Sequence, residues 1–151
     1  MAAARSRRIP GDLYKRLEQL ERRLERWGIL LERNADDELD TIGEARGVYI
    51  AALFHGKMDG TGILRIRRNP TQYEILHELG HILDFRRNPV RWVRPASNEA
   101  LALVIREQAV YNRLRNSRSW YRLSFEERLH AYRYIENLGG NPRSTWKEIA
   151  R

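Results

Sequence analysis

The sequence predicts an α+β fold in which helices pack around a small, mostly antiparallel sheet. Three observations support this class: an amphipathic stretch opens the chain, short β-prone runs follow it, and helical stretches with clear start signals fill the second half. A length of 151 residues fits one compact domain. We therefore expect a single domain over residues 10–151, preceded by a flexible basic tail of residues 1–9.

The composition is that of a folded protein, and it excludes several kinds of site. Hydrophobic residues make up 42% of the chain and charged residues of both signs 32%, which distinguishes it from a disordered segment. The chain contains no cysteine, so a disulfide, a thiolate metal site and a cysteine nucleophile are all excluded. No apolar run could span a bilayer, and the N-terminus lacks the apolar stretch of a secretory signal. We expect a soluble, cytoplasmic protein.

The net charge of +8 and the isoelectric point near 10.3 describe a basic protein. Such a surface suits nucleic acid, an anionic membrane or an acidic protein, and charge alone does not choose among these partners. Residues 15–27 combine Arg and Lys with Glu at helical spacing, which favours a solvated helix face for this part of the charge.

The N-terminal region predicts one helix and one short strand. Four leucines recur at three- and four-residue spacing over residues 12–27, which is typical of a helix with one buried face. They are Leu13, Leu17, Leu20 and Leu24. Gly28 can end this helix, and residues 29–31 predict a short strand. The acidic, turn-rich residues 34–44 predict a loop with one helical turn.

The central region predicts an antiparallel hairpin. Residues 47–54 form a continuous β-prone run, and residues 63–67 alternate apolar and basic side chains. The Asp59-Gly60 and Thr61-Gly62 steps between the two runs are typical of a turn.

A helix over residues 71–84 is predicted next. Thr71 and Glu74 have the spacing of a capping box, in which each side chain satisfies a backbone donor of the other residue. Residues 86–95 then predict a basic loop, because two prolines interrupt any helical pattern there.

The C-terminal region predicts two further helices. Residues 98–115 form the first, with Ser97 as its cap. Residues 124–138 form the second, which opens with the capping-box pair Ser124 and Glu127 and ends at a glycine pair.

The helix over residues 71–84 carries a metal-site motif. His77 and His81 are four residues apart, so their imidazoles project from the same helix face, close enough to share a zinc ion. Glu78 lies about 100° around the helix, where it can take a proton from a zinc-bound water. The flanking residues are apolar, and a buried helix does not hold two imidazoles and a carboxylate without partners. The alternative is a pair of core histidines bonded to backbone carbonyls.

The third zinc ligand must be sought elsewhere, because a catalytic zinc usually has three protein ligands and one open position. The class with a third His six residues after the second is excluded, since Arg87 stands there. Two carboxylates on the 98–115 helix remain. Glu107 lies at the centre of the predicted apolar face, where it needs a cation, and we prefer it. Glu99 is the runner-up, because its place in the first turn is explained by the helix dipole.

Other polar residues have weaker assignments. Tyr111 lies one turn beyond Glu107 and is a candidate oxyanion donor, although a core tyrosine explains it equally well. Asp84 is either a residue that orients a ligand or a helix-end residue. His130 is predicted to face solvent, and His55 is interpreted as an exposed strand end.

These motifs carry a family resemblance. The run from Tyr73 to His81 resembles the core of the minimal zincin fold of the gluzincin type. Residues 107–114, 123–127 and 131–135 resemble the C-terminal half of zincin-like metallopeptidase toxin domains of bacterial polymorphic toxins. The similarity covers roughly residues 45–140.

The resemblance implies a zinc-dependent metallopeptidase that acts on a protein or peptide substrate. It further implies an effector delivered into a target cell and neutralised by a cognate immunity protein, for which an acidic protein would be electrostatically suitable. A regulatory peptidase of the repressor-cleaving type is an alternative, although that group often has His where this chain has Asp84. The thermolysin-like pattern fits less well, since Leu103 stands where that family has Asp.

A second hypothesis is a basic binding module on a zincin scaffold. Residues 86–94 interleave arginines with Trp92, a combination that can contact phosphates and stack on bases. Because this segment directly follows the helix with the metal-site motif, the alternative is a wall of the cleft or the docking site of an acidic inhibitor. An intact Glu78 favours the enzyme, because a scaffold has no use for a general base. We therefore do not expect nucleic acid as the partner.

Overall fold

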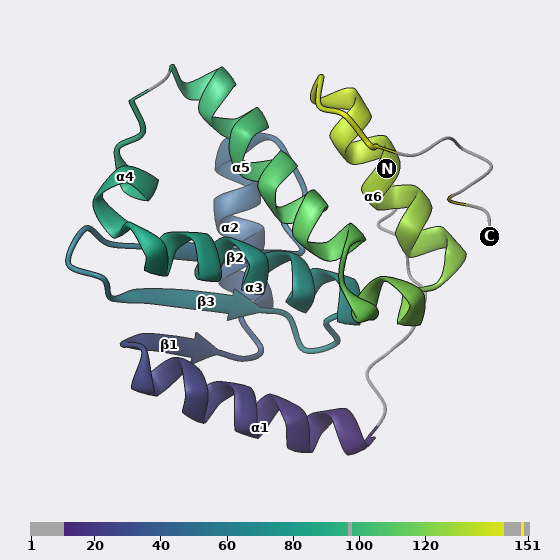
Figure 1. Cartoon of the computed structure of the whole chain (residues 1–151). Helices are drawn as coiled ribbons and strands as arrows, with labels where there is room; N and C mark the ends of the chain where they lie inside the picture. The colour runs from purple at the N-terminus through teal and green to yellow at the C-terminus, as the bar shows by residue number, and fades with distance from the viewer. Residues whose placement is uncertain (1–10, 97, 144–148, 150–151) are drawn as a thin grey trace. The chain divides into compact units, whose positions relative to one another are not determined.

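The computed structural model describes residues 11–96, 98–143 and 149, with side chains from residue 16 onward. The described chain divides into two compact units, an N-terminal unit that ends at Arg94 and a C-terminal unit that begins at Pro95. The elements of both are traced in Figure 1. The single domain over residues 10–151 stays a prediction, and the basic tail of residues 1–9 lies outside the described residues.

The α+β class is confirmed, with a helix at the start of the described chain and a small sheet after it. The N-terminal unit contains α1 (Gly11–Arg26), β1 (Ile29–Glu32), α2 (Asp36–Arg46), β2 (Ala52–Gly56), β3 (Gly62–Ile66), α3 (Gln72–Arg87) and α4 (Pro89–Val93). The C-terminal unit contains α5 (Glu99–Arg115), the 3₁₀ helix η1 (Arg118–Arg122) and α6 (Phe125–Asn137). None of the helices in the described part of the chain combines the length and apolar character that a membrane crossing requires.

The sheet has the strand order β1-β3-β2, so β2 and β1 are its edges. The predicted antiparallel hairpin is confirmed, with Phe54 opposite Leu64. Strand β1 pairs with β3 in parallel, with Leu31 opposite Leu64. The sheet is therefore mixed, because α2 and β2 lie between β1 and β3 in the chain and carry it back to the same end of the sheet.

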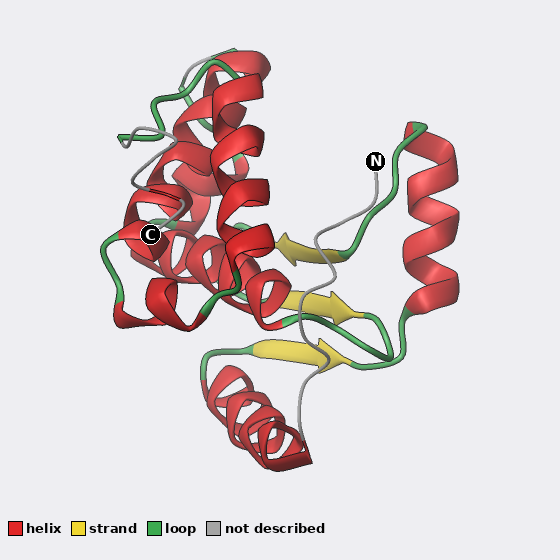
Figure 2. Ribbon diagram, turned by 90° about the vertical axis from the view of Figure 1, so that its right-hand side faces the viewer, coloured by secondary structure: helices red, strands yellow, loops and turns green. Residues whose placement is uncertain are grey.

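The two faces of the sheet pack against different helices. Successive strand residues point to opposite faces, and Phe54 joins the main core with residues from α1 and α3. That core consists of Leu17, Leu24, Ile29, Leu31, Phe54, Leu64, Ile66, Ile82 and Phe85. Leu53, on the opposite face, packs against a smaller cluster with Leu39 of α2. Figure 2 shows α1 below the strands and α2 to their right.

The prediction of a loop over residues 34–44 is wrong, because this segment contains α2. Its first turn carries Asp36, Asp37 and Glu38, which suit a helix N-terminus. Leu39 is fully buried, and Gly47 ends the helix in the left-handed conformation, with φ 71°. The acidic first turn and the glycine after the last turn are signals of a helix in this sequence. The apolar residues between them form only a weak stripe, so their spacing alone does not predict one.

The strand predicted over residues 47–54 begins later than expected, at Ala52. The chain before it is used to end α2, since the backbone N–H of Val48 donates to the carbonyl of Gly43 at 3.0 Å. A backbone N–H that bonds to the end of a helix cannot also bond to a neighbouring strand. β propensity alone therefore predicts the start of this strand too early.

The capping box at the start of α3 is confirmed. The Thr71 N–H donates to Glu74 Oε2 at 2.9 Å, and the Glu74 N–H donates to Thr71 Oγ1 at 3.2 Å. The helix continues beyond the predicted end at residue 84 to Arg87. Much of the predicted basic loop of residues 86–95 is therefore helical, because Asn88 caps α4 and Pro89 suits the first turn of a helix.

In the C-terminal unit, Asn98 caps α5 by accepting a bond from the Leu101 N–H at 2.8 Å. The predicted cap Ser97 lies outside the described residues. The capping box of Ser124 and Glu127 is confirmed at α6. The apolar face predicted for α5 includes Leu103, and this part of the prediction is wrong, since Leu103 is 42% exposed.

Candidate metal centre

Helix α3 presents the two predicted histidine ligands on one face. The rings of His77 and His81 have centroids 4.9 Å apart and meet edge to face at 79°. Their ligand nitrogens lie within 4.8 Å of each other. His81 is buried, and the His77 side chain retains 19% exposure. Two imidazoles that converge at the edge of solvent are a pair of side chains that could hold a metal ion.

Glu78 lies beside this pair and is buried. Its Oε2 accepts a hydrogen bond from the backbone N–H of Phe54 at 3.1 Å. Its Oε1 lies 3.4 Å from His77 Nδ1. Since β2 is an edge strand, this N–H would otherwise be a buried donor without a ladder partner. The bond therefore satisfies the strand and orients the carboxylate.

The close approach of α3 to β2 depends on a glycine. A Cβ added at Gly56 would lie 2.5 Å from Cε1 of Phe85, closer than real Cβ contacts allow. Only glycine therefore lets the Phe85 ring lie against β2 without displacement. No local pattern in the sequence marks Gly56 for this role.

Aromatic rings hold the imidazoles on two sides. Tyr73 stacks on His77, with centroids 5.8 Å apart and planes at 21°. Trp92 of α4 meets His81 edge to face at 6.2 Å. Trp92 also packs against Phe54 at 5.5 Å. The Trp92 ring is therefore a wall of the core and of the histidine pair, and binding of nucleic acid by this segment stays an untested alternative.

The two candidate carboxylates of α5 differ in burial as expected. Glu107 is 7% exposed, whereas Glu99 is exposed in the first turn of the helix. Next to Glu107, burial lowers the pKa of Arg106, and the Glu107 charge opposes that shift. The burial argument for Glu107 is thus confirmed, and its role as a ligand stays a prediction.

Tyr111 is buried and its hydroxyl has a partner within the C-terminal unit. The hydroxyl donates to the carbonyl of Pro142 at 2.7 Å. Its ring meets Trp120 edge to face at 6.0 Å. A role in oxyanion stabilisation would require the hydroxyl to turn from Pro142, and this role stays a prediction.

Among the described residues, neither His55 nor His130 belongs to a group that could hold a metal ion. His55 on β2 is exposed, as expected. His130 on α6 is partly exposed and stacks on Tyr134, with centroids 6.4 Å apart and planes at 14°. Asp84, near the end of α3, is partly buried.

Comparison with known proteins adds no relative. The chain matches no protein-family model, no curated protein and no solved structure. The case for a function therefore depends on the residues of the site.

Proposed function

We propose that this chain is a zinc-dependent metallopeptidase in which His77, His81 and Glu107 bind one zinc ion. Glu78 is the general base in this proposal. The observation that carries it is the convergence on α3 of two imidazoles with a buried carboxylate whose second oxygen is held by the Phe54 N–H. The bond to Phe54 gives Glu78 a structural role, but that role uses only Oε2 and leaves Oε1 beside His77.

The residues divide the chemistry of peptide hydrolysis among them. Zinc held by these residues would supply a water activated near neutral pH. Glu78 takes a proton from the attacking water through Oε1, because Oε2 is already held by the backbone. As the carbon–nitrogen bond breaks, the same carboxyl delivers that proton to the leaving amine. Tyr111 is the proposed donor to the developing oxyanion.

The biological setting is a further part of the proposal. The resemblance to metallopeptidase toxin domains favours an effector delivered into a target cell and held inactive by an acidic inhibitor protein. A regulatory peptidase of the repressor-cleaving type uses the same residues, so identification of the substrate distinguishes the two settings.

Metal analysis of purified variants tests the ligands directly. We expect one zinc per chain in the wild type, loss of zinc in His81→Ala, and weaker binding in Glu107→Ala. Each of these substitutions removes a bond to the metal ion that other residues do not replace. Glu78→Gln should retain zinc and lose cleavage of a labelled protein substrate, because the amide binds no proton. Glu99→Ala is the matched control and should retain zinc.

Two results would contradict the proposal. Full occupancy in Glu107→Ala together with loss in Glu99→Ala would overturn the choice of the third ligand. A wild-type protein that binds no zinc under any condition would overturn the enzyme assignment.

A further inference from the structure

A basic surface begins at the end of α3 and continues through α4. It consists of four exposed arginines, Arg86, Arg87, Arg91 and Arg94, which we call the arginine surface. No Asp or Glu occurs in the sequence from residue 85 to residue 98. No ion pair of the arginine surface is found within the described residues. Its charge is therefore available to a partner.

Two other arginines of the same unit, Arg65 and Arg67, are paired with carboxylates. Arg65 on β3 pairs with Glu32 and Glu38, each at 2.9 Å. Arg67 pairs with Asp40 at 2.8 Å. The helix dipole accounts for Arg86 and Arg87, which lie in the last turn of α3. The dipole of α3 does not account for Arg94, which lies beyond the end of α4. The positive charges of neighbouring arginines also repel one another.

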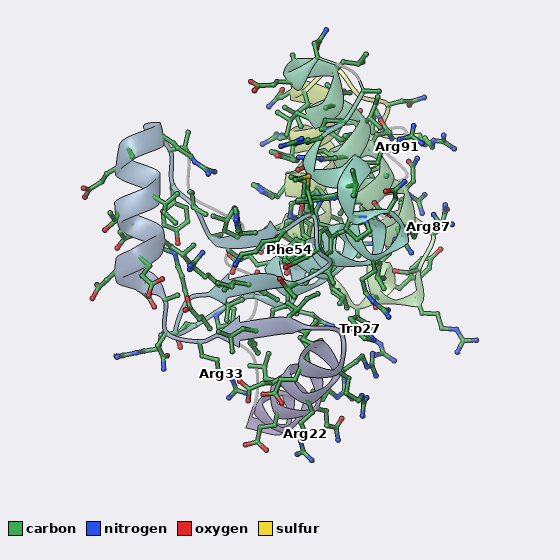
Figure 3. The ribbon with its side chains drawn as sticks, turned by 90° about the vertical axis from the view of Figure 1, so that its left-hand side faces the viewer. Arg22, Trp27, Arg33, Phe54, Arg87 and Arg91 are labelled. Atoms are coloured by element: carbon green, nitrogen blue, oxygen red, sulfur yellow. The ribbon has the colours of Figure 1, made fainter. Side chains whose placement is uncertain are left out.

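The arginine surface adjoins the histidine pair within the N-terminal unit. Trp92, which lies between two of the arginines in the chain, contacts the ring of His81. Arg87 lies on the metal-site helix itself. Figure 3 shows Arg87 and Arg91 projecting on the same side of the unit. A polypeptide bound at the histidine pair could therefore continue across these arginines.

The surroundings of the arginine surface favour carboxylates over nucleic acid. The ring of Trp27 is covered by Arg86, whose guanidinium carbon lies 3.8 Å from the ring centroid. Trp92 is packed against core rings, so neither tryptophan is open for base stacking. Val90, by contrast, is 54% exposed among the arginines and offers an apolar contact. Guanidinium groups with an apolar neighbour suit an acidic, partly apolar polypeptide.

We propose that the arginine surface binds acidic residues of the peptide substrate to one side of the bond that is cut. This inference rests on the proposed peptidase function. It makes Arg87 and Arg91 specificity-determining residues, which bind the substrate without contact with the reacting atoms.

The test uses the zinc-loaded full chain and labelled peptides of equal length. One peptide is rich in Glu, Asp and Leu, its counterpart carries Lys in place of the acids, and a single-stranded and a double-stranded DNA serve as competing anions. Binding is measured with Glu78→Gln, which removes the proposed base. We expect the acidic peptide to bind about tenfold or more tightly than the Lys peptide, and to lose this advantage when Arg87→Glu and Arg91→Glu are combined.

A matched control separates local from general charge. Arg46→Glu with Arg122→Glu makes the same change of net charge at exposed positions outside the arginine surface. It should change the affinity by no more than about threefold, since salt weakens the effect of exposed charges that the peptide does not contact. All four positions are exposed, so both double variants should fold, and circular dichroism checks this.

Cleavage by enzyme with Glu78 intact completes the test. We expect the acidic peptide to be cut, with KM raised and kcat unchanged by the double change at Arg87 and Arg91. Equal affinity for both peptides, or an equal loss in the control variant, would overturn the inference. Tighter binding of DNA, lost in the same double variant, would assign the surface to nucleic acid. If both peptides are cut without charge preference, only the inference about the arginine surface is overturned. If the acidic peptide binds but no peptide is cut, the substrate assignment and the peptidase function are overturned together.

Discussion

Glu78 is the residue on which the proposed chemistry most depends. A buried carboxylate is costly unless hydrogen bonds compensate for lost water, and here the Phe54 N–H supplies one. The same bond fixes the direction of the second oxygen. A general base needs that direction, because proton transfer occurs only within hydrogen-bond reach. One backbone donor thus serves both stability and the proposed chemistry.

Gly56→Ala tests the close approach that makes this bond possible. The new Cβ would press into the Phe85 ring, so either the ring or β2 must move. We expect a loss of about 1–3 kcal/mol in the free energy of unfolding, the usual cost of overpacking a core. Urea unfolding measures this loss. Because β2 carries Phe54, the variant should also lose peptide cleavage.

A double-mutant cycle identifies the cause. In a Phe85→Leu background the smaller side chain leaves room for the new methyl group, so Gly56→Ala should cost clearly less than in the wild type. Equal costs in the two backgrounds would show that the ring is not what excludes a side chain at this position.

At the scale of elements, local capping signals predicted helix starts well. The Thr71–Glu74 and Ser124–Glu127 boxes lie where the sequence placed them, because each depends on residues three apart. Predictions of loops were less successful. Helices α2 and α4 occupy segments predicted as loops, since polar residues and prolines also occur in the first turns of helices.

Thr71→Ala tests the contribution of the cap to the metal-site helix. Removing the hydroxyl leaves the Glu74 N–H without its acceptor, and loss of such a cap costs about 1 kcal/mol of unfolding free energy. Thr71→Ser keeps the oxygen and should restore most of that stability in urea unfolding. The histidine pair begins more than a turn later, so zinc stoichiometry should not change. Equal losses in the two variants would mean that the methyl group, rather than the cap, matters at this position.

At the scale of the whole molecule, the proposed zinc ion links function to stability. A ligand that binds only the folded state stabilises it by about 2.7 kcal/mol when its free concentration is one hundred times its Kd. For a chain of this size each kcal/mol raises the unfolding midpoint by about 2–4 °C.

We therefore expect added zinc to raise Tm by about 5–11 °C in differential scanning calorimetry, and a chelator to reverse the change. His81→Ala should show no such shift at the same zinc concentration. Glu99→Ala, a change at an exposed position, should respond like the wild type. An equal shift in His81→Ala would indicate zinc binding elsewhere on the protein.

The sequence by itself determined the features that depend on local spacing. His77 and His81 lie on one face of α3 because four residues make about one turn, and the burial of Glu107 followed from the period of the α5 pattern. The α+β class followed in the same way from the order of local patterns.

Only the tertiary structure decided which distant segments meet. Phe54 holds a carboxylate that lies 24 residues away in the chain, Trp92 lies against His81 instead of facing solvent, and β1 pairs in parallel with β3. These contacts depend on how the faces of separate elements fit together. That fit is a property of packing among many side chains, so no short stretch of sequence carries a signal for it.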